Sequence, residues 1–168
     1  MKLSQLSKLK QLGYYGNPKL KRAGVKLEFT KDQVQEFLKC SVDPIYFIEN
    51  YIKIVNVDKG LIPFKMYDYQ KKMVNKFNES RYTINLCARQ SGKSSTVISY
   101  FIWYILFNEH VNLAILGNKE KTAISLLSKL KLAYENLPMF IQQGVAEWNK
   151  KSIELENGSK IFSSSTSA

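Results

Sequence analysis

The residues best suited to chemistry lie between Cys87 and Ser94, where the chain reads Cys-Ala-Arg-Gln-Ser-Gly-Lys-Ser. This segment follows a β-prone run and opens an apolar, helix-like stretch, which is the context of a phosphate-binding loop. Gly92 permits a tight backbone, and Lys93 has the length and charge to reach nucleotide phosphates. The unpaired amides and positive dipole end of a helix N-terminus attract phosphate further. The alternative is a glycine-containing turn that only begins a buried helix.

The pattern departs from the usual motif at Cys87, which stands where the first glycine is expected. We expect this cysteine to be a small buried residue at a strand end. Cys40 and Cys87 are far apart in sequence, and His110 is the only histidine. A structural zinc site is therefore not expected, and a reducing compartment is.

A triphosphatase of this kind also needs an acidic residue at the end of a later apolar strand, and a group that orients the attacking water. None of the acids after Lys93 closes a run of four apolar residues; they are Glu109, Glu120, Glu135, Glu147, Glu154 and Glu156. The last two alternate with apolar residues, as in a solvated hairpin strand. The sequence therefore predicts half of a catalytic site.

The composition predicts a single domain with a short appendage, since 168 residues with 45% hydrophobic content can form one core. The net charge is +11, and residues 1–26 hold seven basic residues and no acid. Such an arm suits nucleic-acid phosphates or an acidic partner, and the alternative is a solvated leader. The longest apolar stretch, 97–107, is far below the ~20 residues of a bilayer span, so no membrane association is expected.

Periodicity predicts an α/β chain. Helices are expected over 30–38, 45–54, 67–78, 93–107 and 119–136, strands over 82–87 and 111–116, and a hairpin over 152–162 that turns at Asn157-Gly158. Thr30 and Asp43 are the expected caps of the first two helices. The order strand, helix, strand, helix predicts a parallel sheet with right-handed crossovers. Ligands bind such sheets at the carboxyl ends of strands, where residues 87–94 would lie.

Three segments together resemble the N-terminal part of the large terminase subunit, the DNA-packaging ATPase of tailed double-stranded DNA bacteriophages, especially the contractile-tailed type. They are Tyr-Asp-Tyr-Gln at 67–70, Ala-Arg-Gln-Ser-Gly-Lys-Ser at 88–94, and the stretch from Leu137-Pro138 through residues 147–159. The resemblance covers the chain from about residue 30 onward. It implies an incomplete P-loop NTPase sheet of the ASCE or RecA-like type, with a helical N-terminal region and a C-terminal β-hairpin. The expected division is a basic leader (1–28), a helical region with an adenine-contacting segment (29–80), and a partial ATPase core (81–168).

The resemblance also implies roles for particular residues. Tyr69 and Gln70 match the pair that contacts adenine, while Lys93 and Ser94 match the phosphate and Mg²⁺ ligands. Arg89 matches an arginine that senses or stabilises the γ-phosphate, and the alternative for it is a structural ion pair. The implied cofactors are ATP and Mg²⁺. The full set of expected nucleotide-binding residues is Tyr69, Gln70, Ala88, Arg89, Gln90, Ser91, Gly92, Lys93, Ser94 and Ser95, with Arg89 and Lys93 catalytic and Ser94 on the metal.

The function implied is the ATP-binding part of a motor that packages viral double-stranded DNA into proheads. The implied partners are that DNA, the portal protein, the small terminase subunit and the rest of the large subunit, in a pentamer docked on the prohead portal in the host cytoplasm. The family continues into an Asp-Glu-type strand (Walker B) and a nuclease domain. Residue 168 falls before them, as expected for a split, intron- or intein-interrupted gene or a truncated record, so weak nucleotide binding and negligible hydrolysis are predicted. Two alternatives are a helicase-like ATPase fragment and a non-catalytic binding protein with a vestigial P-loop.

Overall fold

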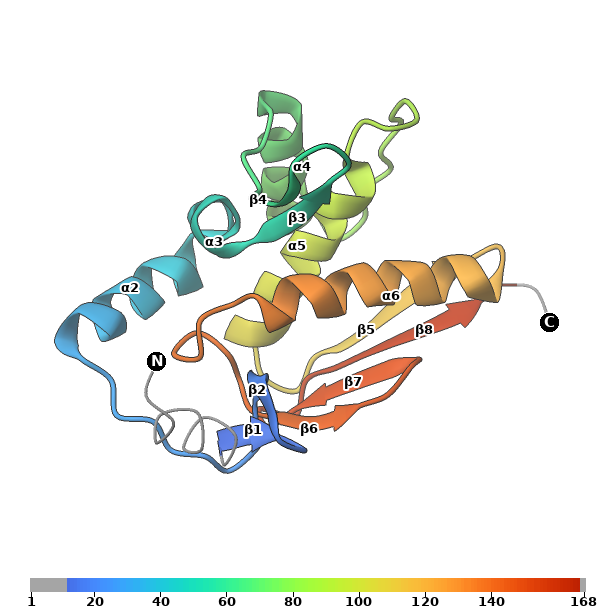
Figure 1. Ribbon diagram of the computed structural model, residues 1–168. Coiled ribbons are helices and arrows are strands. Elements are labelled where there is room, and N and C mark those ends of the chain that lie inside the picture. Colours follow the sequence, from blue (N-terminus) through green and yellow to red (C-terminus); the bar gives the residue numbers. More distant parts are fainter. Residues whose placement is uncertain (1–11, 167–168) are drawn as a thin grey trace.

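The computed structural model describes residues 12–166 as a mixed α/β fold built on one mixed four-stranded sheet (Figure 1). The strand order is β5 (Asn112–Gly117), β8 (Lys160–Ser165), β7 (Ser152–Leu155) and β6 (Val145–Trp148). Only β5 and β8 run parallel, whereas β8, β7 and β6 pair antiparallel. The predicted α/β class is confirmed, but the sheet is mixed where the sequence predicted a parallel one. The predicted hairpin at Asn157-Gly158 is confirmed, and Gly158 adopts φ +77° there.

The helices follow one another along the chain in the order that the sequence predicts, and α6 packs against the sheet. They are α2 (Lys31–Val42), α3 (Pro44–Tyr51), α4 (Asp68–Glu79), α5 (Lys93–Phe107) and α6 (Glu120–Glu135). Thr30 closes a capping box with Gln33, and the Asp43 carboxylate accepts from the amide of Tyr46. Both predicted caps are confirmed.

The apolar helix α5 forms the centre of the core. It packs against α3, α4 and α6, and its buried residues include Ile102, Trp103 and Leu106. A helix that is apolar all round must be covered on several sides, which explains why α5 shows no single hydrophobic stripe. Helix α6 lies along the sheet and contacts both β5 and β8 (Figure 1). Within residues 12–166 no helix is long and apolar enough to cross a membrane.

Two small hairpins were not foreseen. One joins β3 (Lys53–Asn56) to β4 (Gly60–Pro63), where the expected helix over 45–54 ends early. The other joins β1 (Gly13–Tyr14) to β2 (Asn17–Lys21), inside the expected basic leader. Leu20 of β2 is buried in the core, so the part of this leader from residue 13 onward belongs to the folded domain. The remainder of the basic arm, residues 1–11, lies outside the described residues.

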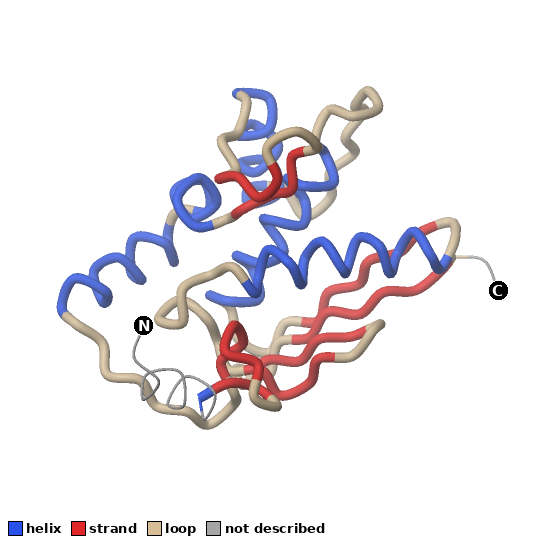
Figure 2. The backbone as a smooth tube through the Cα atoms, viewed as in Figure 1, coloured by secondary structure: helices blue, strands red, loops and turns tan. Residues whose placement is uncertain are grey.

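The expected strand over 82–87 does not form. The connection between α4 and α5 is a loop throughout (Figure 2), and Ile84 and Leu86 are fully exposed within it. A strand needs a neighbour for its backbone groups, and the outer edge of β5 pairs with no strand in the described part of the chain. Asn85 and Ala114 of β5 line the same pocket, but Asn85 forms no strand pairing with β5 in the described residues. Consequently Cys87 is half-buried in a loop, not buried at a strand end.

Candidate functional site

The candidate phosphate loop joins this connection to the first residue of α5. Gln90 and Gly92 have positive φ angles, of 61° and 73°, and Ser91 between them does not. Alternation between right- and left-handed residues can turn successive backbone amides toward one concave side, which is a geometry that binds anions. Helix α5 then begins at Lys93 with Gly92 as its N-cap, and no side chain among residues 12–166 caps it. Its first amides are therefore available to a ligand.

The loop is closed by hydrogen bonds to one carbonyl. The Ala88 oxygen accepts from the Ser91 hydroxyl at 2.9 Å and from the Lys93 ammonium at 3.2 Å. These bonds draw the two ends of the loop together and hold the Lys93 side chain back over the loop. Lys93 is only half-buried. Its positive charge, which the sequence predicts to bind phosphates, therefore lies at the loop and within reach of solvent.

Helix α4 supports the loop from the other side. The Tyr69 hydroxyl donates to the Ser91 carbonyl at 2.5 Å, and the Gln70 amide nitrogen donates to the same oxygen at 3.3 Å. The sequence resemblance assigned these two residues to adenine, and the structure brings both of them into direct contact with the loop. Tyr67 is a neighbour that the sequence reasoning did not assign. Its ring stacks on that of Tyr69 with centroids 5.7 Å apart, and the Tyr-x-Tyr spacing within the motif was the signal for it.

Glu49 of α3 fixes the segment that leads into α4. Its carboxylate accepts from the amide of Met66 and from the ammonium of Lys71, each at 3.2 Å. Burial raises the pKa of Glu49, but the hydrogen bonds from Lys71 and Met66 lower it by more than burial raises it. The pKa of Glu49 therefore lies below its ordinary value. The charged form of Glu49 is thus the one that holds α4, and with it Tyr69 and Gln70, in place.

The remaining predicted residues occupy three different environments. Arg89 and Gln90 are exposed, and Arg89 makes no hydrogen bond or ion pair within residues 12–166, so the alternative of a structural ion pair is not seen. Ser94 lines a pocket of about 320 Å³ together with Lys93 and Asn85. Ser95 lines a separate pocket beside Lys129, on another side of α5. The structure therefore gathers the predicted residues around the loop, except for Ser95.

The Ser94 hydroxyl is the group at the loop that the sequence resemblance assigns to a metal ion. The described part of the chain contains no group of three or more His, Cys, Asp or Glu side chains that could hold a metal ion. In a phosphate loop the metal is shared with the phosphates, and one hydroxyl is the usual contribution of the helix. Ser94, which lines the same pocket as Lys93, fits that contribution.

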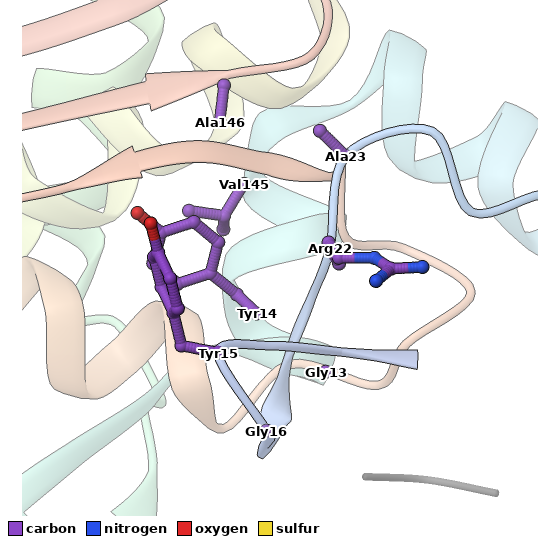
Figure 3. A pocket seen from close by; sticks show the side chains of 8 residues that line it. All are labelled: Gly13, Tyr14, Tyr15, Gly16, Arg22, Ala23, Val145 and Ala146. Carbon is purple, nitrogen blue, oxygen red and sulfur yellow. The ribbon is translucent and has the colours of Figure 1, made fainter. Parts of the chain in front are cut away.

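A hollow larger than the pocket at the loop lies elsewhere, between the β1–β2 hairpin and β6. It has a volume of about 770 Å³, and its lining includes Tyr14, Tyr15, Arg22 and Val145. Figure 3 shows the two tyrosine rings together, with the Arg22 side chain extending away from them. The rings and the guanidinium do not converge on one point, so we place the candidate site at the loop.

No protein-family model matches this chain. The functional assignment therefore rests on the geometry of the loop and on the sequence motifs around it.

Proposed function

We propose that this chain is the nucleotide-binding part of a P-loop ATPase that packages viral double-stranded DNA into proheads. The observation that carries nucleotide binding is the loop at the start of α5. It combines an anion-binding backbone, an uncapped helix N-terminus and the ammonium of Lys93 at one place. The packaging role is supported by the three sequence segments that together resemble large terminase subunits.

The residues at the loop fit ATP and Mg²⁺ as ligands. Lys93 and the amides of the loop would hold the phosphates, and Ser94 would contribute its hydroxyl to the metal. Arg89 is exposed, and no residue of the described part of the chain engages its guanidinium, so it is available to the terminal phosphate. ATP, when bound, supplies the phosphoanhydride bond whose hydrolysis drives translocation. The role of these side chains is to bind and orient the phosphates.

The proposed partners follow from the same resemblance. They are double-stranded viral DNA, the portal protein, the small terminase subunit and the remainder of the large subunit, in a pentamer docked on the prohead portal in the host cytoplasm. The net charge of +11 supports contact with a polyanion.

Lys93→Ala tests nucleotide binding. We expect the 168-residue chain to bind Mg-ATP weakly, and the variant to bind it at least tenfold more weakly, because a charge-assisted hydrogen bond is worth roughly 1.5–3 kcal/mol. Titration followed by NMR measures both affinities, and Lys129→Ala on the exposed face of α6 is the control with the same change in charge. Equal affinities in all three proteins would contradict nucleotide binding at this loop.

Two further measurements test the motor role. We expect negligible ATP turnover by the 168-residue chain, and turnover that disappears in Lys93→Ala would contradict this. The genomic DNA beyond codon 168 is expected to encode an apolar strand ending in Asp-Glu, followed by a nuclease domain. A stop codon with no such frame downstream would contradict a working motor and would leave only nucleotide binding.

A non-catalytic nucleic-acid-binding module is the second candidate, because Lys19, Arg22 and Lys26 are exposed on the folded hairpin and the segment after it. Its test is DNA binding at two salt concentrations, since neutralised phosphates release counterions. Salt-sensitive binding that survives Lys93→Ala but is lost when all three residues are changed to Gln would favour this candidate over the motor. Replacing the side chains is preferable to deleting the segment, because Leu20 belongs to the core.

A further inference from the structure

Gln70 is a buried polar side chain beside the loop, with only 2% of its surface exposed. Its amide oxygen accepts from the backbone amide of Tyr67 at 2.9 Å, and its amide nitrogen donates to the carbonyl of Ser91 at 3.3 Å. One partner is a donor and the other an acceptor, so together they fix which end of the amide is oxygen. Both ends are thus engaged within the protein, and the side chain is covered. A base edge therefore finds almost no exposed surface of Gln70 to contact.

The carbonyl of Ser91 receives a second hydrogen bond, from the hydroxyl of Tyr69 at 2.5 Å. No peptide bond in the described residues is cis, and in a trans peptide the C=O and N–H groups point in opposite directions. Because the Ser91 carbonyl points at α4, the N–H of Gly92 points away from α4. The two α4 side chains therefore set the direction of this loop amide.

Gly92 is the residue that would otherwise allow the peptide between Ser91 and Gly92 to flip. Its φ is +73°, and glycine tolerates either orientation of the peptide beside it. A Cβ at this position would come within 2.5 Å of the Gln70 amide nitrogen, so Gln70 lies directly over the glycine. The amide direction that a phosphate would meet thus depends on Tyr69 and Gln70.

We propose that Tyr69 and Gln70 are positioning residues for the phosphate loop and do not read the base, so that the site recognises the triphosphate and discriminates weakly between purines. This inference rests on the proposed nucleotide-binding function, and it differs from the adenine contact that the sequence resemblance implies. The stacked rings of Tyr67 and Tyr69 are partly exposed at the rim of the loop. Stacking on such rings accepts any base, because every base has a π-face.

Tyr69→Phe is the direct test, because it removes the hydroxyl and keeps the ring. The probes are tripolyphosphate, which has no base, and the magnesium complexes of ATP and GTP, each titrated into the 168-residue chain. We expect Tyr69→Phe to weaken all three by a similar factor of about fivefold, the equivalent of one hydrogen bond. Tyr67→Phe is the matched control, and we expect it to leave tripolyphosphate affinity unchanged. Unchanged tripolyphosphate affinity in Tyr69→Phe would overturn the inference.

Gln70→Glu provides a second, independent test. Glutamate keeps an oxygen for the Tyr67 amide but has no donor for the Ser91 carbonyl. We expect all three affinities to fall while the ratio of ATP to GTP affinity stays within twofold of the unsubstituted protein. A tenfold change in that ratio would show that Gln70 reads the base, and it would overturn the inference without affecting the proposed function.

Hydrogen exchange separates failure of the inference from failure of the proposed function. If the unsubstituted chain binds no triphosphate at all, nucleotide binding fails, and the positioning role is then decided by amide exchange over residues 88–93. We expect exchange there to be faster in Tyr69→Phe than in Tyr67→Phe. Equal rates would overturn the positioning role.

Discussion

Glu156→Gln removes the charge that ties the N-terminal hairpin to the sheet. One carboxylate oxygen of Glu156 accepts from the Lys21 ammonium at 2.9 Å and from the Gly144 amide at 2.7 Å, and the other accepts from the Gly24 amide at 3.0 Å. Glutamine has the same shape but only one acceptor oxygen. The substitution therefore leaves the Gly24 amide facing a donor, and it leaves Lys21 without its counter-charge.

The magnitude follows from how little solvent reaches the pair. The Lys21 side chain is 11% exposed and that of Glu156 is 25% exposed. Removing one partner of a fully buried pair costs about 3–5 kcal/mol, and a charged hydrogen bond is worth about 1.5–3 kcal/mol. Because Glu156 is partly solvated, we expect a loss of about 2–3 kcal/mol in the free energy of unfolding. For a chain of this length that corresponds to a fall in Tm of roughly 5–10 °C.

Urea unfolding at pH 7 measures this loss, and Glu154→Gln is the matched control. Glu154 pairs with Lys160 at 2.9 Å, but those side chains are 34% and 51% exposed, so its substitution should cost less than about 1 kcal/mol. Lys21→Met completes a double-mutant cycle that isolates the coupling energy. The reasoning is refuted if Glu156→Gln unfolds within about 0.5 kcal/mol of the unsubstituted protein, or costs no more than Glu154→Gln.

Three further outcomes are expected. Burial raises the pKa of Glu156, but the hydrogen bonds from Lys21 and two backbone amides outweigh it, so the pKa lies below its ordinary value of 4.5. The stability that ionised Glu156 contributes is therefore present above pH 4.5 and is lost as the pH falls through the lowered pKa. An acid unfolding titration of Glu156→Gln should lack this loss. Gly92→Ala, which strains a φ of +73° and places a Cβ 2.5 Å from Gln70, should weaken tripolyphosphate binding at least tenfold and cost about 1–2 kcal/mol on urea unfolding. Trp103→Phe removes the indole N–H that donates to the buried carbonyl of Cys40 at 2.8 Å, so calorimetry should show a loss of about 2 kcal/mol; an unchanged Tm would mean that water replaces the bond.

Local signals in the sequence were sufficient wherever a few adjacent residues determine the structure. Thr30 and Asp43 cap α2 and α3 because their side chains reach amides three residues ahead. The helix over 93–107 was predicted with its observed bounds. The turn at Asn157-Gly158 formed because Gly158 can adopt a positive φ. In each case the partner lies within one turn of helix or hairpin, so no tertiary information was needed.

Pairings between distant segments were not predictable in this way. Residues 82–87 have the composition of a strand, but a strand forms only beside a partner, and in residues 12–166 no strand pairs with them. Glu156 was expected to be solvated, yet Lys21 lies 135 positions away in sequence and reaches it only because β2 packs beside the sheet. Lys21 itself was counted in a basic arm. The charge of a segment and the alternation of its apolar and polar residues therefore predicted what kind of segment it resembles, but not which distant residues it contacts.

At the candidate phosphate loop the sequence picked out residues that the structure brings together, but the role it implied for Tyr69 and Gln70 was contact with adenine. Tyr69 and Gln70 precede the loop by about twenty positions, and their hydrogen bonds to the Ser91 carbonyl were not predicted from the sequence. A motif, however, records residue types and spacing, and a glutamine amide can serve equally as a base reader or as a support for a backbone carbonyl. The distinction depends on burial and on which partners are already engaged. Because the Tyr67 amide and the Ser91 carbonyl engage both ends of Gln70, the structure favours the supporting role, and base-free triphosphate is the ligand that separates the two.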